Sequence, residues 1–174
     1  MSILEKAKQI ELVIFDVDGV MTDGGLIFGD DGQEYKVFNS LDGHGLRMLF
    51  ESNIKAAVIT GRTSQVVEHR MKNVGIDLIY QGYRDKNPAL EQLKNRTGIP
   101  VEKMAFVGDD VVDLPVMTQV GLAIAVQDAH PYVIQHAHWT TPRAGGHGAV
   151  RDVCELLLEA RGELSAKLET YLSK

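Results

Sequence analysis

The chain has 174 residues, 44% of them hydrophobic, and a formal net charge of −6. This length and composition suit one globular domain with a sizeable core, so we treat residues 1–174 as a single domain. The negative charge and the lack of a basic run argue against nucleic acid as the main partner. Cys154 is the only cysteine, which excludes a disulfide framework and a cysteine metal site. Its place in an apolar helical pattern predicts that it fills the core.

The N-terminal segment carries charges throughout and lacks the apolar core of a signal peptide. No apolar run in the chain approaches the roughly 18 residues that a membrane-spanning helix requires. We therefore expect a cytoplasmic protein without a membrane partner.

Short apolar runs alternate with amphipathic segments along the chain. Strands are predicted at residues 12–15, 56–60, 78–80, 104–108 and 122–126. Helices are predicted between them at residues 41–53, 64–75, 87–98 and 111–121. Buried strands separated by helices of this length form βαβ units, in which helices cover both faces of a parallel sheet. The sequence therefore predicts an α/β fold with a Rossmann-like, doubly wound and mostly parallel sheet.

Residues 24–38 interrupt this alternation and are predicted to form a β-hairpin. We expect Leu26 and Phe28 to face Tyr35 and Val37 across a short turn. Because an isolated hairpin is marginally stable in water, this one should project and pack on another surface.

The C-terminal part of the chain is predicted to hold a helix that faces the core, within residues 148–162. It is followed by a tail, residues 162–174, in which Leu164, Leu168 and Leu172 recur every four residues. The tail is either a fraying helix or a helix that binds a partner, and the pattern does not separate the two.

Polar residues follow four of the predicted strands at their carboxyl ends, which is where ligands bind in an open parallel sheet. They are Asp16 and Asp18 after the first strand, Thr60, Gly61 and Arg62 after the second, Lys86 beyond the third, and Asp109, Asp110 and Asp113 after the fourth. Each group alone could be a helix cap or a solvated side chain. Their occurrence at successive strand ends indicates a functional site, and His130, after the fifth strand, is placed to line it.

Carboxylates gathered in this way cannot all stay ionised unless a divalent cation neutralises them. All-oxygen ligation favours Mg²⁺. Thr60 and the backbone N–H groups after it can donate hydrogen bonds to a phosphoryl group, and Lys86 supplies a cation. Because phosphoryl transfer depends mainly on positioning and on cancelling charge, the pattern predicts this reaction with Mg²⁺ as cofactor.

The motifs that carry these residues resemble those of the haloacid dehalogenase superfamily of phosphatases. They are "DVDGV" (16–20), "VITGR" (58–62), Lys86 and "GDDVVDLP" (108–115), and together they span nearly the whole chain. The resemblance implies that Asp16 is a nucleophile that forms an aspartyl-phosphate intermediate.

The same resemblance assigns roles to the other carboxylates. Asp18 would be the general acid that protonates the leaving alcohol and then the base that activates water. Mg²⁺ would be held by the Asp16 carboxylate, the Asp18 backbone carbonyl and an Asp109 oxygen. Asp110 or Asp113 would orient waters bound to the metal.

The spacing of the motifs leaves no room for the cap domain that closes the site in many superfamily members. Only the hairpin follows Asp18, and the 23 residues of 63–85 separate Arg62 from Lys86. A capless site is closed either by a large substrate or by another subunit. We favour a homo-oligomer with closed symmetry, in which the hairpin acts as a flap.

Within the superfamily, the chain most resembles the phosphatases of 3-deoxy-D-manno-octulosonate 8-phosphate (KDO 8-phosphate), a phosphorylated sugar acid of lipopolysaccharide synthesis in Gram-negative bacteria. Further stretches that carry this resemblance are "FNSLDGHGLRML" (38–49), "AVQDAHP" (125–131) and "AGGHGAVRDVCELLL" (144–158). Such enzymes are tetramers in which the hairpins assemble and neighbouring subunits complete each site. The resemblance therefore implies a tetramer and this substrate.

By this resemblance, Arg62 would contact the sugar acid, and Arg143 with the glycines that follow it would form a mobile loop near the site. Two positions depart from the family pattern, because Leu41 and His147 stand where the family typically has cations. A nine-carbon ulosonate phosphate therefore stays open as the substrate.

Two other kinds of protein remain open. A receiver-like, non-enzymatic phospho-switch uses similar residues, but it places its acidic pair before the phosphorylated aspartate and has no counterpart of Asp18. A phosphomutase or a protein-directed phosphatase of the same superfamily is also compatible with Asp18 and with a capless site.

Overall fold

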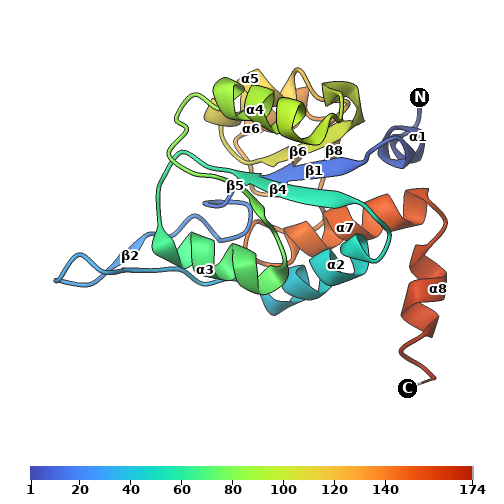
Figure 1. Ribbon diagram of the computed structural model, residues 1–174, viewed down its shortest axis with the longest axis horizontal. Coiled ribbons are helices and arrows are strands. Elements are labelled where there is room, and N and C mark those ends of the chain that lie inside the picture. Colours follow the sequence, from blue (N-terminus) through green and yellow to red (C-terminus); the bar gives the residue numbers. More distant parts are fainter. Residues whose placement is uncertain (174) are drawn as a thin grey trace.

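The computed structural model describes residues 1–173 and centres on a six-stranded parallel sheet with the order β5-β4-β1-β6-β7-β8 (Figure 1). The strands are β1 (Leu12–Phe15), β4 (Lys55–Ile59), β5 (Leu78–Tyr80), β6 (Met104–Gly108), β7 (Leu122–Ala125) and β8 (Trp139–Thr140). A separate two-stranded sheet contains β2 (Ile27–Phe28) and β3 (Glu34–Tyr35). The predicted doubly wound α/β fold is confirmed. Of the described strands, only β8 was missed, because two residues are too few for a periodic pattern. The short helices at 3–8 and 131–136 were not predicted either.

Helices cover both faces of the main sheet (Figure 1). On one face lie α4 (Asn87–Thr97), α5 (Leu114–Met117) and α6 (Pro131–His136), and on the other lie α2 (Ser40–Phe50), α3 (Gln65–Val74) and α7 (Ala149–Ala160). α1 (Ile3–Lys8) packs against α7, and α8 (Leu164–Glu169) follows it. The predicted helix at 111–121 is shorter than expected, because a 3₁₀ turn (Val111–Asp113) precedes α5.

The core lies between the sheet and these helices. All four side chains of β1 are fully buried, which explains its unbroken apolar run. Cys154 is also fully buried, and burial raises the pKa of its thiol, so the prediction that it fills the core is confirmed. Among residues 1–173, no helix is long and apolar enough to span a membrane.

The hairpin of β2 and β3 projects from the edge of the sheet at which β1 ends (Figure 1). Phe28 pairs directly with Glu34, and directly paired residues carry their side chains on the same face. The expectation that Leu26 and Phe28 face Tyr35 and Val37 is therefore wrong by one residue. A shift of one residue exchanges the two faces of a strand, so the charged side chain of Glu34 shares a face with Phe28.

In the C-terminal tail, Leu164 packs against the core, whereas Leu168 and Leu172 are exposed. Tyr171 contacts the ring of His44 on α2, with ring centroids 5.3 Å apart. The tail thus begins as part of the fold, while residue 174 lies outside the described residues.

Candidate active site

The strand ends surround a hollow of ≈ 450 Å³ at the carboxyl edge of the sheet. It is lined by Asp16, Asp18, Gly24, Thr60, Gly61, Arg62, Arg84, Lys86, Asp109, Asp110 and Val112. The sequence prediction included most of these residues, and they come from four separate strand ends. The fold therefore brings the predicted groups together, as expected for the carboxyl ends of parallel strands.

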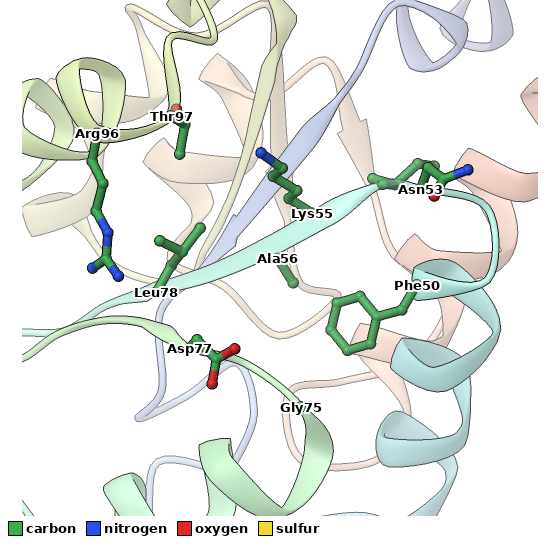
Figure 2. A pocket seen from close by; sticks show the side chains of 10 residues that line it. Phe50, Asn53, Lys55, Ala56, Gly75, Asp77, Leu78, Arg96 and Thr97 are labelled. Carbon is green, nitrogen blue, oxygen red and sulfur yellow. The ribbon is translucent and has the colours of Figure 1, made fainter.

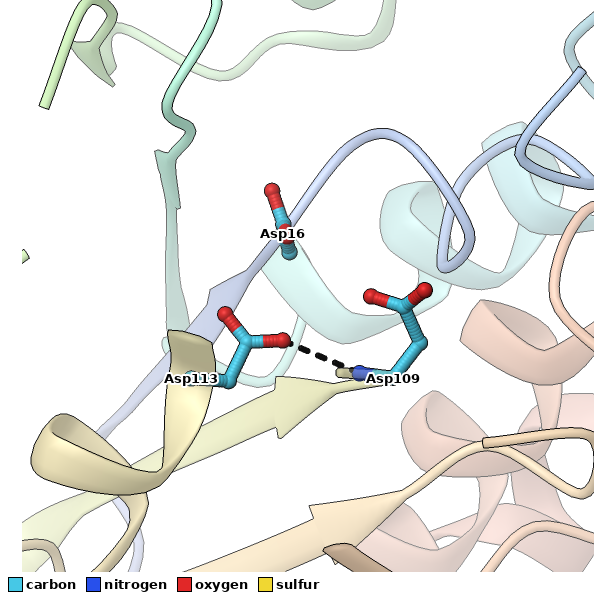
Figure 3. Close-up of side chains that lie close together, drawn as sticks. All are labelled: Asp16, Asp109 and Asp113. Carbon is cyan, nitrogen blue, oxygen red and sulfur yellow. Dashed lines mark hydrogen bonds between the residues drawn. The ribbon is translucent and has the colours of Figure 1, made fainter. Parts of the chain in front are cut away.

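Three carboxylates converge at the floor of this hollow (Figure 3). Oxygens of Asp16, Asp109 and Asp113 all lie within 4.8 Å of one another. Asp16 directly follows β1, and its backbone N–H donates to the carbonyl of Val107 on β6, which places it beside the end of β6. Gly19 permits the close approach of the two strand ends, since a Cβ there would lie 2.0 Å from Oδ2 of Asp109.

Lys86 lies between two of these carboxylates and is only 2% exposed. Its Nζ is 2.8 Å from Oδ2 of Asp16 and 2.5 Å from Oδ1 of Asp113. Burial alone would lower the pKa of Lys86, but the two carboxylates outweigh it and raise this pKa. The ammonium therefore stays charged beside Asp16.

The donor set fits a hard divalent cation between Asp16 and Asp109. Both oxygens of Asp113 already accept hydrogen bonds, from Lys86 and from the backbone N–H of Asp109. Within residues 1–173 the Asp109 carboxylate has no hydrogen-bond donor, and burial with repulsion from Asp113 and Asp16 raises its pKa to about 8. Burial also raises the pKa of Asp16, to about 6, although Lys86 opposes the shift. A cation between these two groups would favour their ionised forms.

Asp18 lies at the other side of the hollow, where the hairpin meets the main domain. Nζ of Lys36 is 2.5 Å from Oδ1 of Asp18 and 3.0 Å from Oε1 of Glu34. Arg62 completes the group, with Nε 3.7 Å from Oδ2 of Asp18 and a terminal nitrogen 3.1 Å from Oε1 of Glu34. The guanidinium of Arg62 also lies over the ring of Phe28.

The sequence prediction missed Glu34, Lys36 and Arg84. Apolar and charged residues alternate visibly over residues 34–37. Because successive side chains of an extended segment point to opposite faces, Tyr35 and Val37 on one face put Glu34 and Lys36 on the other. Arg84 precedes the predicted Lys86 by two residues on the same loop, and among residues 1–173 it forms no ion pair. Both signals were present in the sequence.

Two residues that were predicted to bind the substrate, His130 and Arg143, do not line the hollow. His130 lies behind Asp109, because its backbone N–H donates to the Asp109 carbonyl while its Nδ1 accepts from the N–H of Tyr132 at the start of α6. Arg143 forms an ion pair with Asp152 of α7, at 2.6 Å. In the described part of the chain, neither side chain forms a hydrogen bond or ion pair with Asp16, Asp109 or Asp113.

The glycine loop after Arg143 is packed against the loop that follows β1, and it was expected to be mobile. A Cβ on Gly145 would lie 1.8 Å from the carbonyl oxygen of Gly19, and one on Gly146 would lie 2.4 Å from the backbone nitrogen of Asp23. The N–H of Gly146 also donates to the carbonyl of Val20. The glycines therefore allow this loop to touch the backbone of the loop that follows β1.

A second hollow of ≈ 570 Å³ lies at the opposite, amino-terminal ends of β4 and β5 (Figure 2). Its charged side chains are Lys55, Asp77 and Arg96. It holds no group of carboxylates close enough to share a cation, since the one such group among the described residues is Asp16, Asp109 and Asp113. The chemistry therefore belongs to the first hollow.

Comparison with known proteins agrees with this geometry. The sequence pattern of haloacid dehalogenase-like hydrolases matches residues 77–152. The chain is 49% identical over 162 residues to the 3-deoxy-D-manno-octulosonate 8-phosphate phosphatase of Salmonella typhi, which covers 93% of this chain and 86% of that one. The chain belongs to this phosphatase family.

Solved structures of the family have the same fold. The KDO 8-phosphate phosphatase of Moraxella catarrhalis, in complex with magnesium, phosphate and KDO, is 41% identical, with a TM-score of 0.94 over 97% of each chain. The cobalt-bound enzyme of Haemophilus influenzae is 38% identical, with a TM-score of 0.89 over 92% of this chain and 94% of that one. The family resemblance found in the motifs therefore extends to the whole described fold.

Proposed function

We propose that this protein is a Mg²⁺-dependent phosphatase that hydrolyses KDO 8-phosphate to KDO and phosphate through an aspartyl-phosphate intermediate. The observation that carries the proposal is the convergence of Asp16 and Asp109 next to the buried Lys86. Membership of the family and the magnesium and KDO found in a relative support the substrate and the cofactor.

In the proposed first step, an Asp16 oxygen attacks phosphorus while the bond to the sugar oxygen breaks. Asp18 gives a proton to the departing alcohol. In the second step a water attacks the aspartyl phosphate, Asp18 takes a proton from that water, and phosphate leaves. Thr60 and the backbone N–H of Gly61 donate hydrogen bonds to phosphoryl oxygens, and Lys86 offsets their charge.

The Asp16 carboxylate, the Asp18 backbone carbonyl and the Asp109 carboxylate would hold Mg²⁺, which supplies a positive charge that offsets the charge on the phosphoryl oxygens. Asp113 cannot serve as a free ligand, because Lys86 and the N–H of Asp109 occupy its oxygens. We assign to Asp113 the positioning of these two groups, and to Asp110 the orientation of waters.

The sugar acid brings a carboxylate in addition to its phosphate. Arg62 and Arg84 line the hollow and would meet this second anion. We assign His130 to support of Asp109 from behind, and Arg143 to holding the glycine loop through Asp152. Leu41 and His147, which depart from the family pattern, are both exposed and do not line the hollow, so they give no reason to prefer a nine-carbon substrate.

A substrate panel tests the proposal. The purified protein with Mg²⁺ is offered KDO 8-phosphate, a nine-carbon ulosonate 9-phosphate, other sugar phosphates, nucleotides and phosphopeptides, and kcat/KM is compared. We expect repeated turnover, with the highest value for KDO 8-phosphate. A better nine-carbon substrate or phosphopeptide would overturn the assignment of substrate, and release of only one equivalent of phosphate would indicate a phospho-switch.

We further propose a homo-oligomer, a tetramer by family resemblance, assembled through the hairpin. Several large apolar side chains there are about half exposed or more: Leu26, Ile27, Phe28, Tyr35 and Val37. Exposed apolar side chains gathered on a projecting element are typical of an interface. The single domain, with its flap at 24–38 and its tail at 162–174, would then work in the cytoplasm.

The oligomer is tested with Ile27→Asp, which puts a charge into the apolar face of the hairpin. Light scattering should report a smaller particle than for the native chain, while circular dichroism stays unchanged. The matched control is Asp30→Ala at the hairpin turn. An unchanged particle mass for Ile27→Asp would exclude the hairpin as the interface.

A further inference from the structure

Lys36 is a buried charge on an otherwise exposed hairpin. Its side chain is 1% exposed, whereas its neighbours Tyr35 and Val37 are 51% and 71% exposed. A lysine is almost never fully buried unless it is paired. Lys36 is paired twice, with Asp18 at 2.5 Å and with Glu34 at 3.0 Å.

This arrangement repeats the one around Lys86. There, one buried ammonium lies between the nucleophile Asp16 and a second carboxylate, Asp113. Here, one buried ammonium lies between Asp18 and a second carboxylate, Glu34. We propose that Lys36 is a positioning residue that holds the side chain of Asp18 in the orientation needed to give and take protons, and that the hairpin is thereby part of the catalytic machinery.

The choice of oxygen atoms supports this role. Lys36 donates to Oδ1 of Asp18, while Oδ2 receives no hydrogen bond from residues 1–173 and has Arg62 at 3.7 Å. An ammonium can donate to Oδ1 whether or not Oδ2 carries a proton, because a carbonyl oxygen also accepts. The contact therefore fixes the carboxyl group through both steps and leaves Oδ2 for the proton.

Glu34 keeps this support in place. It accepts from Lys36 and from Arg62, so the group as a whole pairs two carboxylates with two cations. Burial would raise the pKa of Glu34, but its hydrogen bonds, including those from Lys36 and Arg62, outweigh it and lower this pKa. Glu34 therefore stays ionised and holds Lys36 even while Asp18 is protonated.

The inference rests on the proposed function, in which Asp18 is the acid and base. It goes further by making the orientation of Asp18 depend on β3. Any movement of the hairpin away from the main domain would withdraw Lys36 and free the Asp18 side chain to rotate.

The test compares Lys36→Met with Lys36→Arg on an alkyl phosphate, KDO 8-phosphate, and on an aryl phosphate, p-nitrophenyl phosphate. With the alkyl ester, Lys36→Met should lower kcat about 10²-fold, the lower end of general acid–base contributions, with KM within about twofold of wild type. With the aryl ester, whose leaving group needs no proton, the first turnover should stay fast and the second step should be slow. A burst of one equivalent of nitrophenol is therefore expected.

Lys36→Arg should recover at least a tenth of the lost rate, because the guanidinium can still donate to Oδ1. The control is Lys103→Met, which removes an exposed lysine paired with Glu11 and should leave both rates unchanged. Light scattering establishes whether assembly is intact in every variant.

A kcat of Lys36→Met near that of wild type would overturn the inference. A loss of assembly together with activity would also overturn it, because Lys36 would then be a structural residue of the interface. Inactivity of the wild-type chain on every phosphate ester would instead refute the proposed function.

Discussion

On each side of the proposed active site, a buried lysine lies between two carboxylates, but the surrounding structure differs greatly between the two sides. On the sheet side, Lys86 lies between Asp16 and Asp113, beside the ends of β1 and β6, whose apolar residues are all buried. On the hairpin side, Lys36 lies between Asp18 and Glu34 on a pair of two-residue strands. Each of the two aspartates that we propose as catalytic, Asp16 and Asp18, thus has its own buried ammonium.

The difference lies in what surrounds each pair. The side chain of Asp113 has no exposure, so water cannot replace Lys86 there, whereas Asp18 and Glu34 are 21% and 13% exposed. The sheet side, which holds the proposed nucleophile, should therefore carry much of the stability of the fold. The hairpin side should affect the rate with a smaller effect on stability.

The largest effect is expected from Asp16→Asn. An amide cannot attack phosphorus, so kcat should fall by about 10⁴-fold or more at saturating substrate. Phosphate release in the presence of Mg²⁺ measures this loss. Asp77→Asn, at the opposite end of the strands, is the matched control and should keep the wild-type rate. Turnover of Asp16→Asn near wild type would remove Asp16 as the nucleophile.

The next largest effect should come from Lys86→Met, which leaves Asp16 and Asp113 buried without their cation. Breaking one side of a buried pair typically costs about 3–5 kcal/mol of unfolding free energy. Urea unfolding in the absence of divalent cations measures it. Lys36→Met, whose partners water can reach, should lose clearly less. Equal losses for the two variants would contradict the contrast between the two sides.

A third carboxylate, Asp42 at the start of α2, has no ammonium at all. It is 4% exposed, Oδ1 accepts from the N–H of Arg151, and Oδ2 has no partner among the described residues. Burial raises its pKa to about 6, although that hydrogen bond and nearby arginines oppose the shift. Because burial disfavours its charged form, Asp42 should destabilise the fold when it ionises.

The sign of this effect follows from the raised pKa. From the ordinary value of 3.8 up to about 6, the folded state binds more protons than the unfolded state, so stability falls as the pH rises through this window. Asp42→Asn keeps an acceptor for Arg151 and cannot ionise. It should therefore be more stable than wild type at pH 8, by about 3 kcal/mol at most, and similar to it at pH 3. Urea unfolding at the two pH values measures the difference, and an equal gain at both would contradict it.

The sheet side of the site could be predicted from the sequence because its residues follow apolar runs in a fixed way. Asp16, Thr60 and Asp109 each come directly after a buried strand, and parallel strands end at one edge. The hairpin side could not be placed in this way. Its strands are two residues long. The contact of Lys36 with Asp18 requires the hairpin to fold back onto the loop after β1, which no periodic pattern encodes.

The register of the hairpin shows the same limit. Apolar residues occur on both faces of the hairpin, so matching them across the turn cannot separate two registers that differ by one residue. In the structure, the hairpin has the register in which Glu34 and Lys36 point toward Asp18 and Arg62. This register forms ion pairs with the main domain, whereas it does not match apolar residues across the hairpin as predicted.

The backbone contact between Gly145 and Gly19 limits how far the chain can be shortened from its C-terminus. Among the described residues, none after Val112 lines the hollow, yet the segment that leads into α7 packs against the loop that follows β1. Truncation before residue 145 would therefore inactivate the enzyme without removing any group that touches its substrate.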